Sequence, residues 1–243
     1  MKVFIVKNKG AGDKKAFEII KSQIIKKPDS LFGLAVGKTT DGLYKLISKD
    51  AVKNPNLWEK VKLFQIDEYF GIGPDSTLSF NKEIKRELSS LLKTLKKKNI
   101  FLIDGRKNPS QTIKEAYDFI KRNNGFDLII LGIGPKYDPH IAYNTTGKSA
   151  LNSRMRVIDL HPRVASVIAR HGKLTMTYKG ITIGIQDILK SKKVLLIAYG
   201  KEKTKSIKLA FKGKVDTKRA SASALQLHKN LNIVTDKAAG RFL

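Results

Sequence analysis

Short runs of Val, Ile, Leu and Phe recur along the whole chain and are separated by longer stretches of mixed character. The apolar runs occupy residues 3–6, 31–36, 61–66, 100–103, 127–133, 155–160, 194–199 and 232–234. Runs of this length that are apolar on both faces are typical of strands buried in a parallel sheet. We therefore expect each run to form a strand.

Amphipathic stretches with helical spacing lie between these runs. We expect helices at Lys14–Ile25, Asp41–Ser48, Asn81–Leu95, Ser110–Arg122, Lys203–Phe211 and Lys218–Leu227. Alternation of strands and helices predicts an α/β protein with a doubly wound, mostly parallel sheet and helices on both faces. The sequence has no internal repeat or low-complexity linker, so we expect residues 1–243 to form a single domain.

Composition narrows the classes of function. The net charge of +27 would suit a nucleic-acid binder, but the lysines are spread over the whole chain and only nine of the 48 basic residues are arginine. This distribution indicates solvated helix faces and a weak general attraction for anionic substrates, so a specific nucleic-acid partner is not expected. The absence of cysteine excludes disulfides, thiolate metal ligands and a cysteine nucleophile.

The N-terminus carries an apolar run of only four residues, which is too short for a signal peptide or a membrane span. We expect a cytoplasmic protein without a membrane partner.

Four segments follow strands at the edge of the predicted sheet where open α/β proteins bind their ligands. They are Gly37–Thr40, Asp67–Gly71, Gly132–Asn144 and Gly200–Lys203. Because the carboxyl ends of parallel strands share one edge, these segments should converge in one crevice.

Several residues of this edge could hold a phosphate group. Gly37, Lys38 and Thr39 precede a predicted helix whose free N–H groups favour an anion, and Lys203 opens another helix. Arg170 could grip a phosphate with two hydrogen bonds. A plain capped turn, a solvent-facing lysine and a surface arginine remain the alternative interpretations of these residues.

Acidic residues and a histidine at the same edge could transfer protons. Asp67 directly follows the strand predicted at 61–66 and could act as a general base, although a turn-forming Asp is the alternative. Asp138 lies two residues before His140 and could orient its imidazole, although a lone loop histidine is often only a surface residue. No HxH or HExxH spacing predicts a metal site, and no serine occupies a nucleophile elbow.

Taken in order, these segments resemble the glucosamine-6-phosphate deaminase (isomerase) family, with the 6-phosphogluconolactonases as a related group. LFGLAVGKTTDGLYKLI is similar to the phosphate loop of that family, FQIDEYFGI to its Asp-Glu-Tyr segment, DPHIAYN to its catalytic loop and SALQLH to a C-terminal motif. The resemblance covers nearly the whole chain. It implies a Rossmann-type fold, a sugar-phosphate ligand and chemistry that needs no cofactor.

The resemblance also implies roles for individual residues. Asp67 would move a proton between C2 and C1 of the sugar, and His140, oriented by Asp138, would assist ring opening. The 6-phosphate would be bound by Gly37, Lys38, Thr39, Arg170 and Lys203.

The catalytic loop departs from the family pattern at two positions. Thr145 stands where the family has a glutamate, and Pro139 replaces a glycine. The expected reaction is conversion of glucosamine 6-phosphate, or a close amino-sugar phosphate, to fructose 6-phosphate and ammonia. A weakly active or inactive sugar-phosphate-binding paralogue and a 6-phosphogluconolactonase are the alternatives. Trimers and hexamers occur among relatives, and homo-oligomerisation stays open.

Overall fold

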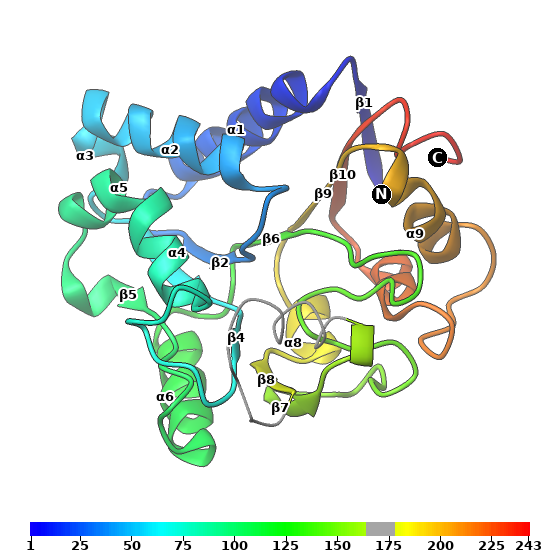
Figure 1. Cartoon of the computed structure of the whole chain (residues 1–243). Helices are drawn as coiled ribbons and strands as arrows, with labels where there is room; N and C mark the ends of the chain where they lie inside the picture. Colours follow the sequence, from blue (N-terminus) through cyan, green and yellow to red (C-terminus); the bar gives the residue numbers. More distant parts are fainter. Residues whose placement is uncertain (164–177) are drawn as a thin grey trace.

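A seven-stranded parallel sheet forms the centre of the protein (Figure 1). The computed structural model describes residues 1–163 and 178–243. Strands pair in the order β1-β10-β9-β6-β2-β3-β5, and every pairing in this sheet is parallel. Their bounds are β1 Lys2–Val6, β2 Leu31–Leu34, β3 Lys62–Gln65, β5 Ile100–Phe101, β6 Leu128–Leu131, β9 Val194–Ala198 and β10 Leu231–Asp236. From β2 the chain proceeds toward β5, whereas from β6 it proceeds the other way toward β10, so the order reverses between β2 and β6.

Helices cover both faces of this sheet. One face carries α1 Lys9–Lys26, α2 Asp41–Lys53, α3 Pro55–Trp58, α4 Phe80–Glu87 and α5 Ser89–Thr94. The other carries α6 Pro109–Arg122, α8 Ile185–Leu189, α9 Lys201–Phe211 and the 3₁₀ helix η2 Ser221–Leu227. Side chains of β6 alternate between the two layers, because Leu128 and Ile130 pack on the first face and Ile129 and Leu131 on the second. The predicted doubly wound fold is confirmed.

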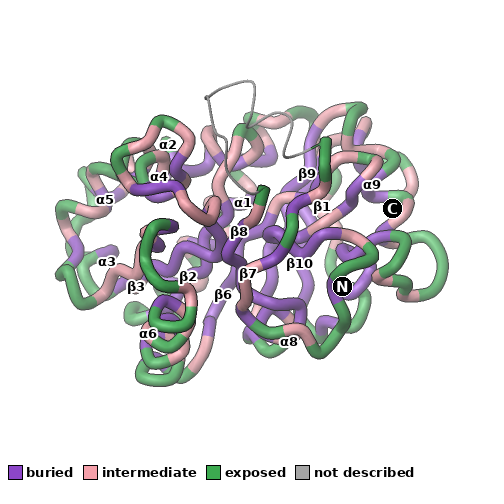
Figure 2. The backbone as a smooth tube through the Cα atoms, turned by 60° about the horizontal axis from the view of Figure 1, so that its bottom comes forward, coloured by how far each residue is buried: buried purple, intermediate pink, exposed green. Residues whose placement is uncertain are grey.

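Burial on both faces explains why the strands are continuous apolar runs. Every residue of β2, β6 and β9 is buried, and Figure 2 shows central strands in purple while the helices alternate between buried and exposed residues. Removing a Leu or Ile side chain from water stabilises a fold by about 1.5–3 kcal/mol. Burial of these strands therefore contributes strongly to the hydrophobic stabilisation of the fold.

Polar caps fix where several helices begin. The side chains of Asn8, Ser79 and Asn108 each accept a hydrogen bond from a backbone N–H in the first turn of α1, α4 and α6. Such caps satisfy N–H groups that have no partner within the helix.

A second, antiparallel sheet of three strands lies beside the main one. It contains β4 Asp67–Tyr69, β8 Lys179–Thr182 and β7 Arg156–Asp159, in the order β4-β8-β7. The strand expected at 155–160 is present, but it belongs to this small sheet. Strands β4 and β8 were not expected, because neither contains an apolar run that would identify it.

Two predicted helices differ from the observed ones. The helix expected at Asn81–Leu95 is divided into α4 and α5 at Leu88, whose backbone leaves the helical region. Instead of an α-helix at Lys218–Leu227, the chain forms a turn and then η2. Serines cause this change: Ser223 Oγ accepts from Asp216 N, and Ser221 Oγ donates to the carbonyl of Asn144. The helices α3 and α8 were not predicted because each is only about one turn long. A 3₁₀ turn, η1 Lys97–Asn99, precedes β5.

Within residues 1–163 and 178–243, no helix combines the length and apolar character needed to cross a membrane.

Candidate active site

A cavity of about 470 Å³ opens at the carboxyl ends of the central strands. It lies where the strand order reverses between β2 and β6, which is where α/β sheets commonly bind ligands. Residues from all four predicted segments line it: Ala35, Val36, Gly37, Lys38, Thr39, Thr40, Asp67, Tyr69, Phe80, Gly132, Ile133, Gly134, Pro135, Tyr137, His140, Ala142, Tyr143, Glu202 and Lys203. The structure thus brings together the predicted site residues of these segments, with Asp138 directly behind His140. Arg170 lies outside the described residues.

The loop after β2 presents backbone N–H groups to the cavity. Gly37 has φ +142°, a conformation that side chains disfavour, and its carbonyl accepts from both N and Oγ1 of Thr40 at 2.9 Å. The N–H groups of Lys38 and Thr39 have no hydrogen-bond partner among the described residues, and α2 begins directly after Thr40. Free N–H groups at the positive end of a helix favour an anion.

Lys203 enters the same cavity from the first turn of α9. Its Nζ donates to the carbonyl of Ile133 at 2.7 Å, so the amine is held against the loop after β6. Burial lowers the pKa of Lys203, and the nearby Glu202 carboxylate only partly opposes this effect. An ammonium has three N–H donors, so two remain for an anion in the cavity.

Asp67 lies where the chain leaves the parallel sheet and joins the antiparallel one. Gln65 Nε2 donates to the Asp67 carbonyl at 2.8 Å, which fixes the backbone at this crossing. The residue is only 5% exposed, and its Oδ1 has no hydrogen-bond partner in the described part of the protein. Burial, with a smaller contribution from the Glu68 charge, raises the pKa of Asp67 to about 8. Such a carboxyl group can gain or lose a proton near neutral pH.

Glu68 is adjacent in sequence but points away from the cavity. Its carboxylate accepts hydrogen bonds from the N–H groups of Tyr69, Phe80 and Asn81 and from Ser79 Oγ, at 2.8–3.1 Å. Glu68 therefore anchors the start of α4 to β4 and does not face the cavity.

Asp138 and His140 form a hydrogen-bonded pair. His140 Nδ1 lies 2.8 Å from Asp138 Oδ2, and the second carboxylate oxygen accepts from Thr146 N at 2.8 Å. Burial would raise the pKa of Asp138, but the hydrogen bonds from His140 and Thr146 hold it below its ordinary value. The Asp138 carboxylate thus orients the imidazole, whose Nε2 has no partner among the described residues.

Thr145 and Pro139, the two residues of this loop that differ from the family pattern, make hydrogen bonds to other segments of the backbone. Thr145 is buried and its Oγ1 donates to the carbonyl of Asp159 at 3.1 Å, so it contributes no group to the cavity. The Pro139 carbonyl accepts from Ala222 N at 3.0 Å and ties the loop to η2.

Three aromatic rings form a wall that sequence reasoning did not identify. Tyr69, Phe80 and Tyr143 pack together with ring centroids 4.9–5.7 Å apart, and all three line the cavity. The aromatic residues that follow Asp67 and His140 were a usable signal for Tyr69 and Tyr143. Phe80 had none, because only the packing of α4 brings it to the site. Such a wall offers an apolar surface to a bound ligand.

No group of three or more His, Asp or Glu side chains in the described ranges is arranged to hold a metal ion.

Comparison with known proteins adds independent information. Residues 11–233 match the family described as glucosamine-6-phosphate isomerases/6-phosphogluconolactonase. Glucosamine-6-phosphate deaminase from Thermoanaerobacter sp. (strain X514) is 32% identical, covering 100% of this chain and 95% of that protein. The enzyme of the same name from Clostridium botulinum (strain Langeland) is 34% identical, covering 98% of this chain and 97% of the relative.

Solved structures have the same fold. A monomeric glucosamine-6-phosphate deaminase superposes with a TM-score of 0.89 at 26% identity, and the match covers 100% of both chains. A 6-phosphogluconolactonase from Thermotoga maritima gives a TM-score of 0.76 at 20% identity, covering 97% of this chain and 99% of that one.

Proposed function

Because the chain belongs to the glucosamine-6-phosphate isomerase/6-phosphogluconolactonase family, we propose that it converts glucosamine 6-phosphate, or a close amino-sugar phosphate, to fructose 6-phosphate and ammonia. The observation that carries this proposal is the buried Asp67 carboxyl group, with a pKa near 8, in one cavity with His140 and an anion-binding loop. The deaminase names of relatives at 32–34% identity support the same substrate class.

The phosphate group of the substrate binds at the loop after β2. The N–H groups of Lys38 and Thr39 and the ammonium of Lys203 supply hydrogen-bond donors from two sides of the cavity. Fixing the phosphate orients the sugar chain, and orientation contributes several kcal/mol to catalysis.

His140 assists ring opening. The ring opens when the proton of the C1 hydroxyl is removed and the ring oxygen gains a proton. The imidazole can relay this proton, because Asp138 holds Nδ1 and leaves Nε2 available. The aromatic wall of Tyr69, Phe80 and Tyr143 supports the sugar during this step.

Asp67 then moves a proton from C2 to C1 of the open-chain sugar. The C2 proton is acidic because it is next to the C1 carbonyl, and a carboxylate is a sufficient base for it. Loss of the C2 proton, with protonation of the C1 carbonyl oxygen, gives an enolamine, and return of the proton to C1 gives a protonated imine at C2. Water adds to that imine, the C–N bond breaks, and ammonia is released. Fructose 6-phosphate is the sugar product.

Direct assay of both products tests the reaction. The protein is incubated with glucosamine 6-phosphate, and ammonia and fructose 6-phosphate are measured over time. We expect the two products in equal amounts. Thermal stabilisation by the sugar phosphate without turnover would instead identify a binding paralogue, in line with the Thr145 departure.

A second arm tests the lactonase alternative. The same preparation is incubated with a 6-phosphogluconolactone, and acid release is measured. Lactone hydrolysis without deamination would replace the proposed reaction. The lactonase structures have identities of 20% or below, so their likeness supports the fold alone.

A further inference from the structure

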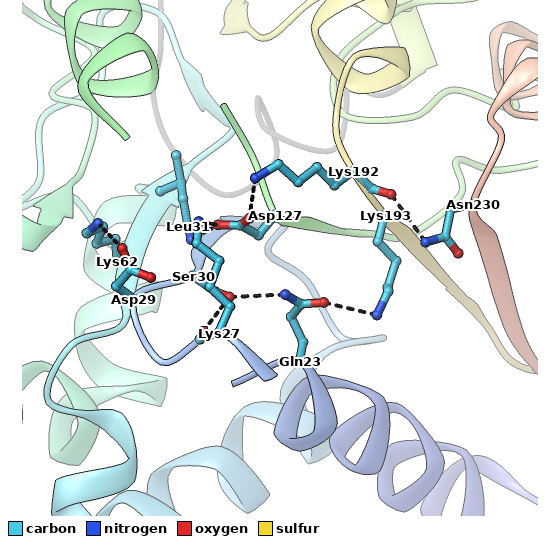
Figure 3. Close-up of polar contacts among 10 residues, drawn as sticks. All are labelled: Gln23, Lys27, Asp29, Ser30, Leu31, Lys62, Asp127, Lys192, Lys193 and Asn230. Carbon is cyan, nitrogen blue, oxygen red and sulfur yellow. Dashed lines mark hydrogen bonds and ion pairs between the residues drawn. The ribbon is translucent and has the colours of Figure 1, made fainter. Parts of the chain in front are cut away.

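A second hollow lies at the opposite edge of the main sheet, at the amino ends of the central strands. This cavity has a volume of about 420 Å³ and is lined by Gln23, Lys26, Lys27, Asp127, Lys192, Lys193 and Asn230. The residues come from the end of α1 and from the segments that enter β6, β9 and β10, and Figure 3 shows all of them except Lys26. None of them lines the candidate active site.

The one carboxylate in this hollow is already fully paired. Asp127 is 1% exposed and accepts from Lys27 Nζ at 2.7 Å, Lys192 Nζ at 2.8 Å and Leu31 N at 2.9 Å (Figure 3). Burial would raise the pKa of Asp127, but these bonds hold it below the ordinary value. Asp127 therefore stays charged and neutralises no further lysine.

Two lysines of the hollow have no carboxylate partner within residues 1–163 and 178–243. Lys193 Nζ donates to the neutral Gln23 Oε1 at 3.0 Å (Figure 3), and Lys26 has no ion pair among the described residues. Burial, and then the charges of Lys26 and Lys2, lower the pKa of Lys193. Like charges held together in a cavity without compensation attract an anion.

The C-terminal end of α1 explains only part of this arrangement. A helix C-terminus attracts cations, which accounts for Lys26 and Lys27. It does not account for Lys193, which belongs to another segment and is partly buried beside the same charges.

We propose that this hollow binds a small ligand carrying two or more phosphate charges, held between Lys26 and Lys193. Lysine binds phosphate as a compact point charge, and this hollow contains no arginine, whose planar fork recognises carboxylates and phosphates with two hydrogen bonds. The concave shape and the small volume fit a small molecule better than a nucleic-acid backbone, which needs an extended basic stripe.

Calorimetric titration with inorganic pyrophosphate tests this site independently of the proposed reaction. The test variant is Lys26→Gln/Lys193→Gln, which leaves the Asp127 ion pairs in place. The matched control is Lys53→Gln/Lys85→Gln, which removes two exposed lysines that line neither cavity. A third variant, Lys203→Gln, removes the lysine of the candidate active site.

We expect pyrophosphate to bind this site about a hundredfold more weakly in the test variant, since two charge-assisted hydrogen bonds are lost. Binding at this site should be unchanged in the control and in Lys203→Gln. Equal binding by the test and control variants would overturn the proposal, as would citrate binding as tightly as pyrophosphate. Should the double variant fail to fold, Lys26→Gln alone carries the test, because this lysine is exposed at a helix end.

Discussion

Asp67 and Glu68 are neighbouring carboxyl groups with opposite surroundings. Successive residues of a strand point to opposite faces, so β4 directs Asp67 into the cavity and Glu68 toward the start of α4. The sequence identified Asp67 as a candidate base because it follows a strand. It could not show that Glu68 is fully satisfied by hydrogen bonds, since its donors lie up to 13 residues away.

The raised pKa of Asp67 predicts a pH dependence of activity. A general base works as the carboxylate, so kcat/KM should fall about tenfold per pH unit below a pH near 8. A profile of kcat/KM against pH measures this limb. An acid limb near pH 4, the range of an ordinary aspartate, would contradict the assignment.

The same pKa predicts how Asp67→Asn changes stability. In the folded protein the carboxyl group keeps its proton up to about pH 8, whereas in the unfolded chain it loses it near pH 4. The wild-type protein therefore loses stability as pH rises between these values, and the amide variant does not. Thermal denaturation at several pH values measures this difference. The stability of Asp67→Asn relative to the wild-type protein should increase from pH 4 to about pH 8 and should stay constant above pH 8.

At the scale of elements, the loop after β2 and the segment that follows β3, where Asp67 lies, set the geometry of the cavity. Both segments were predicted from the sequence because each follows an apolar run and contains glycine. The turn at Gly37 was correctly placed. The division of α4 from α5 and the antiparallel pairing of β4 with β8 were not predictable, because tertiary contacts decide them. Serines likewise changed a predicted helix into η2 by bonding to other segments.

Gly37→Ala tests the loop as an anion site. A Cβ at this position has no atom within 4 Å, so the substitution acts only through the φ of +142°, at a cost of about 1–3 kcal/mol. We expect a raised KM for the sugar phosphate with a smaller change in kcat. Steady-state kinetics separate the two, and Gly125→Ala, another open glycine with positive φ, is the control for stability alone. An unchanged KM would argue against phosphate binding here.

Glu68→Gln tests the anchor between β4 and α4. The substitution replaces one accepting carboxylate oxygen with an N–H₂ group. That group faces N–H and hydroxyl donors, so buried hydrogen bonds are lost and donors are left facing donors. We expect a loss of about 2–4 kcal/mol in unfolding free energy, measured by urea denaturation. The exposed Glu18→Gln is the matched control and should change stability by less than about 0.5 kcal/mol.

At the scale of the whole molecule, the alternation of strands and helices predicted the doubly wound sheet. It did not predict the strand order, because pairing of β1 with β10 joins the two ends of the chain. The reversal between β2 and β6 explains why segments far apart in sequence form one cavity. The two-residue spacing of Asp138 and His140 led to the prediction that they act as a pair, and the structure adds the hydrogen bond between them.

The single-domain expectation leads to a calorimetric prediction. Both core layers pack on the same sheet, so they should unfold together. We expect one thermal transition whose calorimetric enthalpy equals its van 't Hoff enthalpy. Two resolved transitions would indicate that the chain contains separate cooperative units.

The comparison of wild-type protein with Asp67→Asn on glucosamine 6-phosphate tests the central claim most directly. The measurement is kcat for ammonia release, together with the shift in melting temperature caused by the sugar phosphate. We predict that Asp67→Asn lowers kcat by about 10²–10⁴-fold, the usual contribution of a general base, while stabilisation by the ligand is retained. Wild-type turnover by Asp67→Asn would show that another group moves the proton.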